Sequence, residues 1–171
     1  MNTRQVDVAI IGAGTAGLAA FRAAKAAGAS AAMLVLIAGP AAAHIIPDPS
    51  SIQPGTRATV AFNIEHGCGT SPTTKLTFKI PKRVKRVEAV AKTGWKERVS
   101  GGTVVFAGGP LGAHTEDTFS ITFTAPNKKT VLVWKVIQSC VVGVNRWIDT
   151  SKNADEPPPR VGVGVKVKLP D

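Results

Sequence analysis

The stretch Asp117-Thr118-Phe119-Ser120-Ile121-Thr122-Phe123-Thr124 decides the fold of this chain, because polar and apolar side chains alternate along it. Alternation with a period of two residues is typical of a β-strand with one buried face. The stretch Thr74-Lys75-Leu76-Thr77-Phe78-Lys79-Ile80 repeats the pattern, with Leu76, Phe78 and Ile80 expected to face inward. Both stretches therefore predict strands of a sheet that is covered on one side.

Further short runs of the same kind follow one another at regular intervals, and turn signals such as Gly101-Gly102 and Pro126-Asn127 separate them. No helical period is present in this part of the sequence. It therefore predicts an all-β fold, an antiparallel β-sandwich over residues 44–150. The tail, residues 151–171, is rich in proline and charge and is predicted to be extended or partly disordered. The other predicted strands cover residues 56–64, 84–90, 94–99, 103–107, 131–138 and 145–149.

Upstream of the strands, residues 30–43 have the features of the apolar region and cleavage site of a signal peptide. An apolar segment is followed by Gly39-Pro40 and then by the A-x-A pattern Ala41-Ala42-Ala43. Cleavage after Ala43 predicts an exported, periplasmic protein whose first residue is His44. A terminal histidine is a metal chelator, since its α-amine and its imidazole Nδ1 can close a ring on one metal ion.

Residues 1–29 carry a different signal. Residues 6–11 predict a strand, Gly12-Ala13-Gly14-Thr15-Ala16-Gly17 fits the G-x-G-x-x-G dinucleotide motif, and residues 18–27 predict a helix. This piece resembles the N-terminus of the dihydrolipoamide dehydrogenase-type flavoproteins. The acidic residue expected about 20 positions further on is missing, as are further β-α-β units. We therefore interpret it as a non-functional fragment, with an FAD- or NAD-linked oxidoreductase as the alternative.

The exported part carries 18 Lys and Arg against 10 Asp and Glu, and much of the excess lies in Lys82-Arg83-Val84-Lys85-Arg86. We interpret this run as a solvated hairpin or an edge strand, since charges there block edge pairing. The alternative is a patch for nucleic acid or an anionic membrane, but neither interleaved aromatic residues nor a nucleic-acid motif accompanies the run. No long apolar run follows residue 43, so we expect no membrane span in the mature chain.

Cys68 and Cys140 are the two cysteines of the chain, and both fall in the exported part. An even pair in one small domain of an oxidising compartment predicts a disulfide. A thiolate metal site is the alternative, although neither cysteine lies in a C-x-x-C or C-x-x-H pairing.

Short motifs spread over residues 44 to about 150 together resemble the YcnI family of exported copper-binding proteins. The resemblance implies a cupredoxin-like or immunoglobulin-like β-sandwich. It also implies a copper-trafficking protein rather than an enzyme, with periplasmic or membrane copper-transport proteins as partners. In chain order, the motifs are His44 after the signal peptide, Ser71-Pro72-Thr73-Thr74-Lys75, Lys92-Thr93-Gly94-Trp95, Glu116-Asp117-Thr118-Phe119-Ser120-Ile121, Trp134-Lys135-Val136-Ile137-Gln138-Ser139 and Asn145-Arg146-Trp147.

The resemblance further implies one Cu(II) held by a monohistidine brace. Carried over by position, His44 gives its amine and Nδ1, Glu116 gives a carboxylate, and Trp134 lies near the metal. Asp117 is the fallback carboxylate, because the loop before it has His114 near a position where many members carry a further acidic residue. Two nitrogens and one carboxylate oxygen suit the tetragonal preference of Cu(II).

Each of these residues also has a simpler interpretation, as the residue after a cleavage site, an exposed carboxylate or a core tryptophan. His66 and His114 remain open as extra ligands or as solvated loop residues, and Trp95 and Trp147 are assigned to packing. Two other functions compete with copper trafficking. One is a copper enzyme, which would use a second brace histidine, and the other is a metal-free module that makes contacts in the cell envelope.

Overall fold

The computed structural model describes residues 8–11, 22–28, 31–34 and 44–169, and the chain divides into two compact units, Met1–Ala41 and Ala42–Asp171. In the first unit, β1 (Val8–Ile11) and β2 (Ala31–Leu34) pair in parallel, and residues 22–26 form a helix. The glycine motif and the predicted cleavage site lie outside the described residues. No helix within the described ranges is long and apolar enough to cross a membrane.

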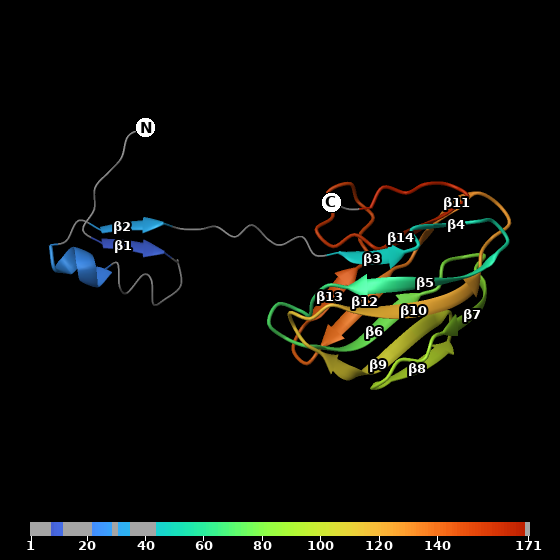
Figure 1. The fold of residues 1–171 in the computed structure, drawn as a ribbon, viewed down its shortest axis with the longest axis horizontal. Coiled ribbons are helices and arrows are strands. Elements are labelled where there is room, and N and C mark those ends of the chain that lie inside the picture. Colours follow the sequence, from blue (N-terminus) through green and yellow to red (C-terminus); the bar gives the residue numbers. More distant parts are fainter. Residues whose placement is uncertain (1–7, 12–21, 29–30, 35–43, 170–171) are drawn as a thin grey trace. The chain divides into compact units, whose positions relative to one another are not determined.

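The second unit is a sandwich of two antiparallel sheets, which confirms the predicted fold class (Figure 1). The first sheet has the order β3-β5-β10-β7 and the second has the order β13-β12-β6-β9-β8. The first sheet consists of β3 (Ile45–Asp48), β5 (Arg57–Ile64), β10 (Asp117–Thr124) and β7 (Lys85–Ala89). The second consists of β13 (Val144–Trp147), β12 (Val136–Cys140), β6 (Thr73–Lys79), β9 (Thr103–Leu111) and β8 (Trp95–Ser100).

Aromatic side chains from the two sheets form the core between the layers. The ring centroids of Phe62 in β5 and Phe78 in β6 lie 5.1 Å apart, and those of Phe106 in β9 and Phe119 in β10 lie 5.2 Å apart. All four rings are fully buried. The alternation that predicted these strands explains the core, because every second side chain of each strand faces the opposite sheet.

A third, smaller sheet with the order β11-β14-β4 contains part of the predicted tail. In it, β14 (Arg160–Val163) pairs antiparallel with β11 (Thr130–Val133) and parallel with β4 (Ser51–Ile52). Val161 and Val163 are fully buried. This segment of the tail is extended, as one of the two predicted alternatives has it, but it is a paired strand whose apolar side chains complete the core, so the sandwich continues beyond the predicted boundary at residue 150.

Two further differences concern strand boundaries. The strand predicted over residues 131–138 is in fact two strands, β11 and β12, which belong to different sheets. Between them, Trp134 N donates to Pro159 O at 3.0 Å. The short strand β3 was not predicted, because Pro47 interrupts it; proline cannot donate to a ladder and is tolerated on an edge strand such as this one. The basic run leads into β7, which is confirmed as an edge strand.

We expect Val161→Ala to lower the free energy of unfolding by about 1–3 kcal/mol, because it removes fully buried methyl groups. The matched control is Val142→Ala, since Val142 is 72% exposed and its truncation should change stability by less than about 0.5 kcal/mol. Denaturant unfolding of both variants measures the difference. Equal values for the two variants would contradict a structural role for β14.

Candidate metal centre

Strand register brings His44, Glu65 and Glu116 side by side at one end of the first sheet. The first residue of β3 and the first residue of β10 both stand opposite Ile64, the last residue of β5. One position further out on the three strands are His44, Glu65 and Glu116. Side-chain alternation places these three on the outer face of the sheet, away from the core that buries Ile64.

Two hydrogen bonds involve the residues of this row. His44 N donates to Glu65 Oε2 at 3.0 Å, and Asn63 Nδ2 donates to Glu116 Oε2 at 3.5 Å. His44 and Glu65 are half-buried, and Glu116 is exposed. We call these four residues, His44, Asn63, Glu65 and Glu116, the outer-face cluster. It brings the imidazole and the backbone nitrogen of His44 to the same face of the sheet as two carboxylates.

Glu65 was not among the residues singled out from the sequence. It lies directly after the predicted strand over residues 56–64, and nothing in its local pattern distinguishes it from any solvated carboxylate. The signal that identifies it is the pairing of β3 with β5, which places it opposite His44. That pairing was beyond the reach of the sequence, because β3 itself was not predicted.

Asp117, the fallback carboxylate, faces the other way from the outer-face cluster. Its Oδ1 lies 2.6 Å from Lys92 Nζ and also accepts a hydrogen bond from Thr118 N at 2.8 Å. The same Lys92 ammonium lies 5.0 Å from the ring centroid of Phe119, a residue of the core. Asp117 therefore forms an ion pair beside the inner face, and of the two predicted carboxylates Glu116 is the one on the side of His44.

Trp134 does not join the outer-face cluster. It is fully buried, and its ring centroid lies 5.5 Å from that of Phe62 and 5.1 Å from that of Phe123. Both phenylalanines belong to the inner face of the sheet whose outer face carries His44. The indole Nε1 of Trp134 is buried and has no hydrogen-bond partner among the described residues. The structure thus places Trp134 in the core.

His66 lies in the loop after β5, where its backbone is tied to the second sheet. The buried Gln138 side chain donates to His66 O at 2.6 Å and accepts a hydrogen bond from Trp147 Nε1 at 3.0 Å. The His66 and Trp147 ring centroids are 6.3 Å apart, and His66 Nδ1 contacts the carbonyl of the next residue. His114 is exposed, and within residues 44–169 its side chain makes no hydrogen bond or ion pair.

The predicted disulfide between Cys68 and Cys140 is present, with the two Cα atoms 6.0 Å apart, so neither sulfur is a free thiolate. The loop after β5, which contains Cys68, is also fixed to the segment before β10, because Gly67 N donates to Ala113 O at 2.9 Å. A Cβ at Gly67 would collide with Ser71 O, which explains glycine there. These contacts hold the loop that begins at Glu65 against the loop that ends at Glu116.

A metal site made only of side chains is absent from the described residues, where no group of three or more His, Cys, Asp or Glu is arranged to hold an ion. A brace needs fewer residues than such a group, because one histidine supplies two donors and a single carboxylate can complete the set. Adjacent ligands about 2 Å from a metal lie about 2.8 Å from each other. The 3.0 Å separation of His44 N and Glu65 Oε2 is close to that value. This contact fits a brace in which His44 and one carboxylate share an ion once the bond before His44 is cut, whereas within the described residues no hydrogen bond joins Glu116 to His44.

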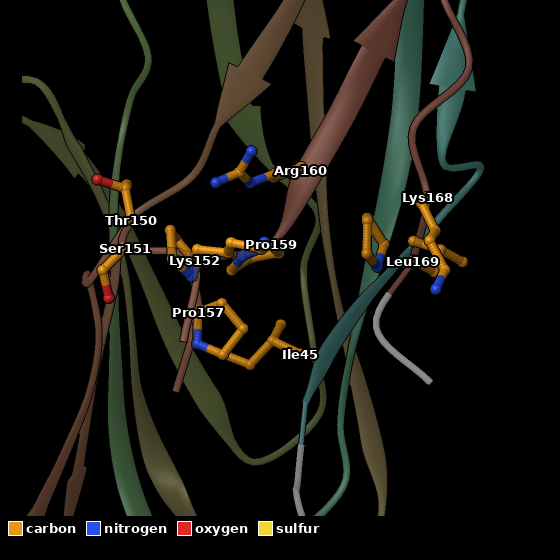
Figure 2. Close-up of a pocket in the computed structure, with 11 residues that line it drawn as sticks. Ile45, Thr150, Ser151, Lys152, Pro157, Pro159, Arg160, Lys168 and Leu169 are labelled. Atoms are coloured by element: carbon orange, nitrogen blue, oxygen red, sulfur yellow. The ribbon is translucent and has the colours of Figure 1, made fainter. Parts of the chain in front are cut away.

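A hollow of about 500 Å³ lies beside β3, where the segment after β13 passes the C-terminal residues (Figure 2). Its lining contains no carboxylate, imidazole or thiol side chain, so it is not a metal site. The lining residues are Ile45, Pro47, Thr150, Ser151, Lys152, Pro157, Pro158, Pro159, Arg160, Lys168 and Leu169.

These features define an immunoglobulin-like β-sandwich with a polar cluster at one end of its outer face. A family model described as a domain of unknown function (DUF1775) matches residues 44–104 and 97–163, and the chain belongs to this family. It is the family of the YcnI-like proteins, so that resemblance is confirmed. The match includes β14 but not residues 1–43, and the likeness of residues 1–29 to flavoproteins stays a prediction.

Among solved structures, an uncharacterised protein from Nocardia farcinica with an immunoglobulin-like fold is similar. It has a TM-score of 0.60 and 18% identity, over 70% of this chain and 97% of that one. A putative membrane-anchored protein from Corynebacterium diphtheriae has a TM-score of 0.48 and 10% identity, over 83% of this chain and 41% of that one. No curated protein sequence matches the chain. The Nocardia likeness shows the fold alone.

Replacing both cysteines with serine should lower the free energy of unfolding by about 4 kcal/mol, because the disulfide spans 72 residues and restricts the unfolded chain. Denaturant unfolding measures the effect. A reducing agent should destabilise the wild-type protein by a similar amount and leave the double variant unchanged. If the double variant were as stable as the oxidised wild type, the disulfide would contribute nothing to folding.

Proposed function

We propose that the processed protein, beginning at His44, binds one Cu(II) ion and carries it outside the cytoplasm. The α-amine and imidazole Nδ1 of His44 supply two nitrogens, and Glu65 and Glu116 supply carboxylate oxygens. Nitrogen and carboxylate donors suit the tetragonal preference of Cu(II). This proposal keeps His44 and Glu116 from the sequence, adds Glu65, and leaves out Trp134 because of its position in the core.

The single observation that carries the proposal is the contact between His44 N and Glu65 Oε2 at 3.0 Å. It puts an acidic side chain beside the one nitrogen that becomes an amine when the chain is cut before His44. Membership of the family with YcnI-like proteins supports copper as the metal. The exposed position of Glu116 favours transfer over storage, because a partner could reach a metal bound there.

A location outside the cytoplasm, reached by export, fits the proposal best. Disulfides form and persist in oxidising compartments, and Cys68 and Cys140 are joined. Residues 42–171 form a compact unit by themselves, so the part that remains after cleavage contains the whole sandwich. We expect the partners to be envelope or membrane proteins that donate or accept copper.

The test compares protein beginning at His44 with the same protein carrying one extra N-terminal Met. Titration with Cu(II), followed by electron paramagnetic resonance, should give one tight tetragonal site in the first form alone, because the extra residue converts the amine to an amide. Circular dichroism of both forms is the control for folding. If both forms bind alike, or neither binds, the amine is not a ligand and a metal-free module becomes the better interpretation.

Substitutions of single carboxylates should show which of them contribute to Cu(II) binding. Glu65→Gln and Glu116→Gln should each weaken Cu(II) binding at least about tenfold, since each removes an anionic donor or its orienting contact. The control is Asp117→Asn, which removes the same charge one residue from Glu116 but on the inner face. Competition titration against a chelator measures all three affinities, and an Asp117→Asn loss larger than that of Glu116→Gln would reverse the assignment.

A further inference from the structure

We propose that a basic hollow between β7 and the connection from β10 to β11 binds a polyvalent phosphate-type anion. The hollow has a volume of about 630 Å³. Its cationic lining consists of Arg83, Lys85, Arg86 and Lys128, all exposed. In the first sheet β7 is the edge opposite β3, so this hollow is separate from the outer-face cluster and the proposal does not depend on copper (Figure 1).

The four cations of the hollow lack acidic partners within the described residues. The ion pairs in residues 44–169 are Arg57 with Glu88 and Lys92 with Asp117, and no Asp or Glu lines the hollow. A concave surface lined by charges of one sign concentrates ions of the opposite sign. Four uncompensated positive charges around one concavity therefore fit an anion that carries more than one negative charge.

The backbone at two of these arginines is unusual. Arg83 has a φ of 69° and Arg86 a φ of 49°, in the left-handed region that non-glycine residues seldom adopt. Val84 N donates to Pro81 O at 3.4 Å across a turn in which glycine would suit position 83. Arg86 O is held by a hydrogen bond from Arg57 Nη1 at 2.9 Å. Such backbone strain in non-glycine residues is concentrated at ligand-binding sites, and the turn itself does not require arginine.

The hollow also contains neutral polar groups. Asn127 lines it and is exposed. Thr124 lines it as well, and its Oγ1 is buried without a hydrogen-bond partner among the described residues. Buried hydroxyl groups in proteins are normally satisfied, so an unpaired one requires an explanation. Guanidinium groups pair with phosphate oxygens in a two-pronged geometry, which favours a phosphate-type anion over a simple halide.

The test uses the full chain of 171 residues and calorimetric titration with inorganic pyrophosphate and with inorganic phosphate. The variant is Arg83→Gly with Arg86→Asn, because Gly and Asn adopt positive φ readily and should preserve the fold. The charge-matched control is Lys96→Gln with Arg98→Gln, two exposed residues of β8 outside the hollow. Thermal unfolding of each variant checks that the sandwich is intact.

We expect the hollow variant to bind pyrophosphate at least about tenfold more weakly than the wild type, and the control to bind within about twofold of it. Sedimentation with phosphatidylcholine vesicles, with and without phosphatidylglycerol, tells the sources of the anion apart. Binding to acidic vesicles alone, lost in the hollow variant, assigns the site to a lipid phosphate. Equal losses in variant and control, or binding of wild type to none of these probes, would overturn the proposal.

Discussion

The pairing of β5 with β3 on one side and with β10 on the other is the constraint on which the rest of the sandwich depends. A slip of one residue in either pairing would turn a whole strand over, since side chains alternate between the faces. The slip would expose Phe119 or Ile45 and bury polar residues in their place. Burial of these apolar side chains therefore fixes the register, and the register in turn places His44, Glu65 and Glu116 in one row. The geometry of the candidate site follows from the core.

The sequence predicted the strands whose pattern is long enough to be read. Those over 57–64, 73–79 and 117–124 each have seven or eight residues and one buried face, so alternation identifies them. Both β3 and β14 are short and lie beside prolines, Pro47 within β3 and Pro157 to Pro159 before β14, so no alternation could be read there. The break at Trp134 was missed for another reason. A continuous apolar run shows that a segment is buried, but it carries no sign of a change from one sheet to another.

Only part of the candidate site could be predicted, because the residues of a family motif can serve the packing of the fold as well as the site. Lys92-Thr93-Gly94-Trp95 is a motif of the fold: Lys92 pairs with Asp117, and the Trp95 ring packs 4.8 Å from that of Phe119. Trp134 belongs with these structural residues, since a large indole in an apolar segment contributes most when buried. Glu65 is the opposite case. Its proposed role depends on a neighbour 21 residues away in the sequence, and no local pattern encodes that contact.

Under the proposed function, processing before His44 would link the compartment of the protein to its chemistry. In the uncut chain the His44 nitrogen is an amide whose electron pair is delocalised into the carbonyl group, so it can donate a hydrogen bond but is a poor metal ligand. Its contact with Glu65 already places that nitrogen against a carboxylate. Cutting the chain changes the nitrogen to an amine without requiring the strands to move, because β3 is held by its ladder to β5. A site built in this way would be assembled by folding and activated by cleavage, so a chain that has not been exported would not compete for copper in the cytoplasm.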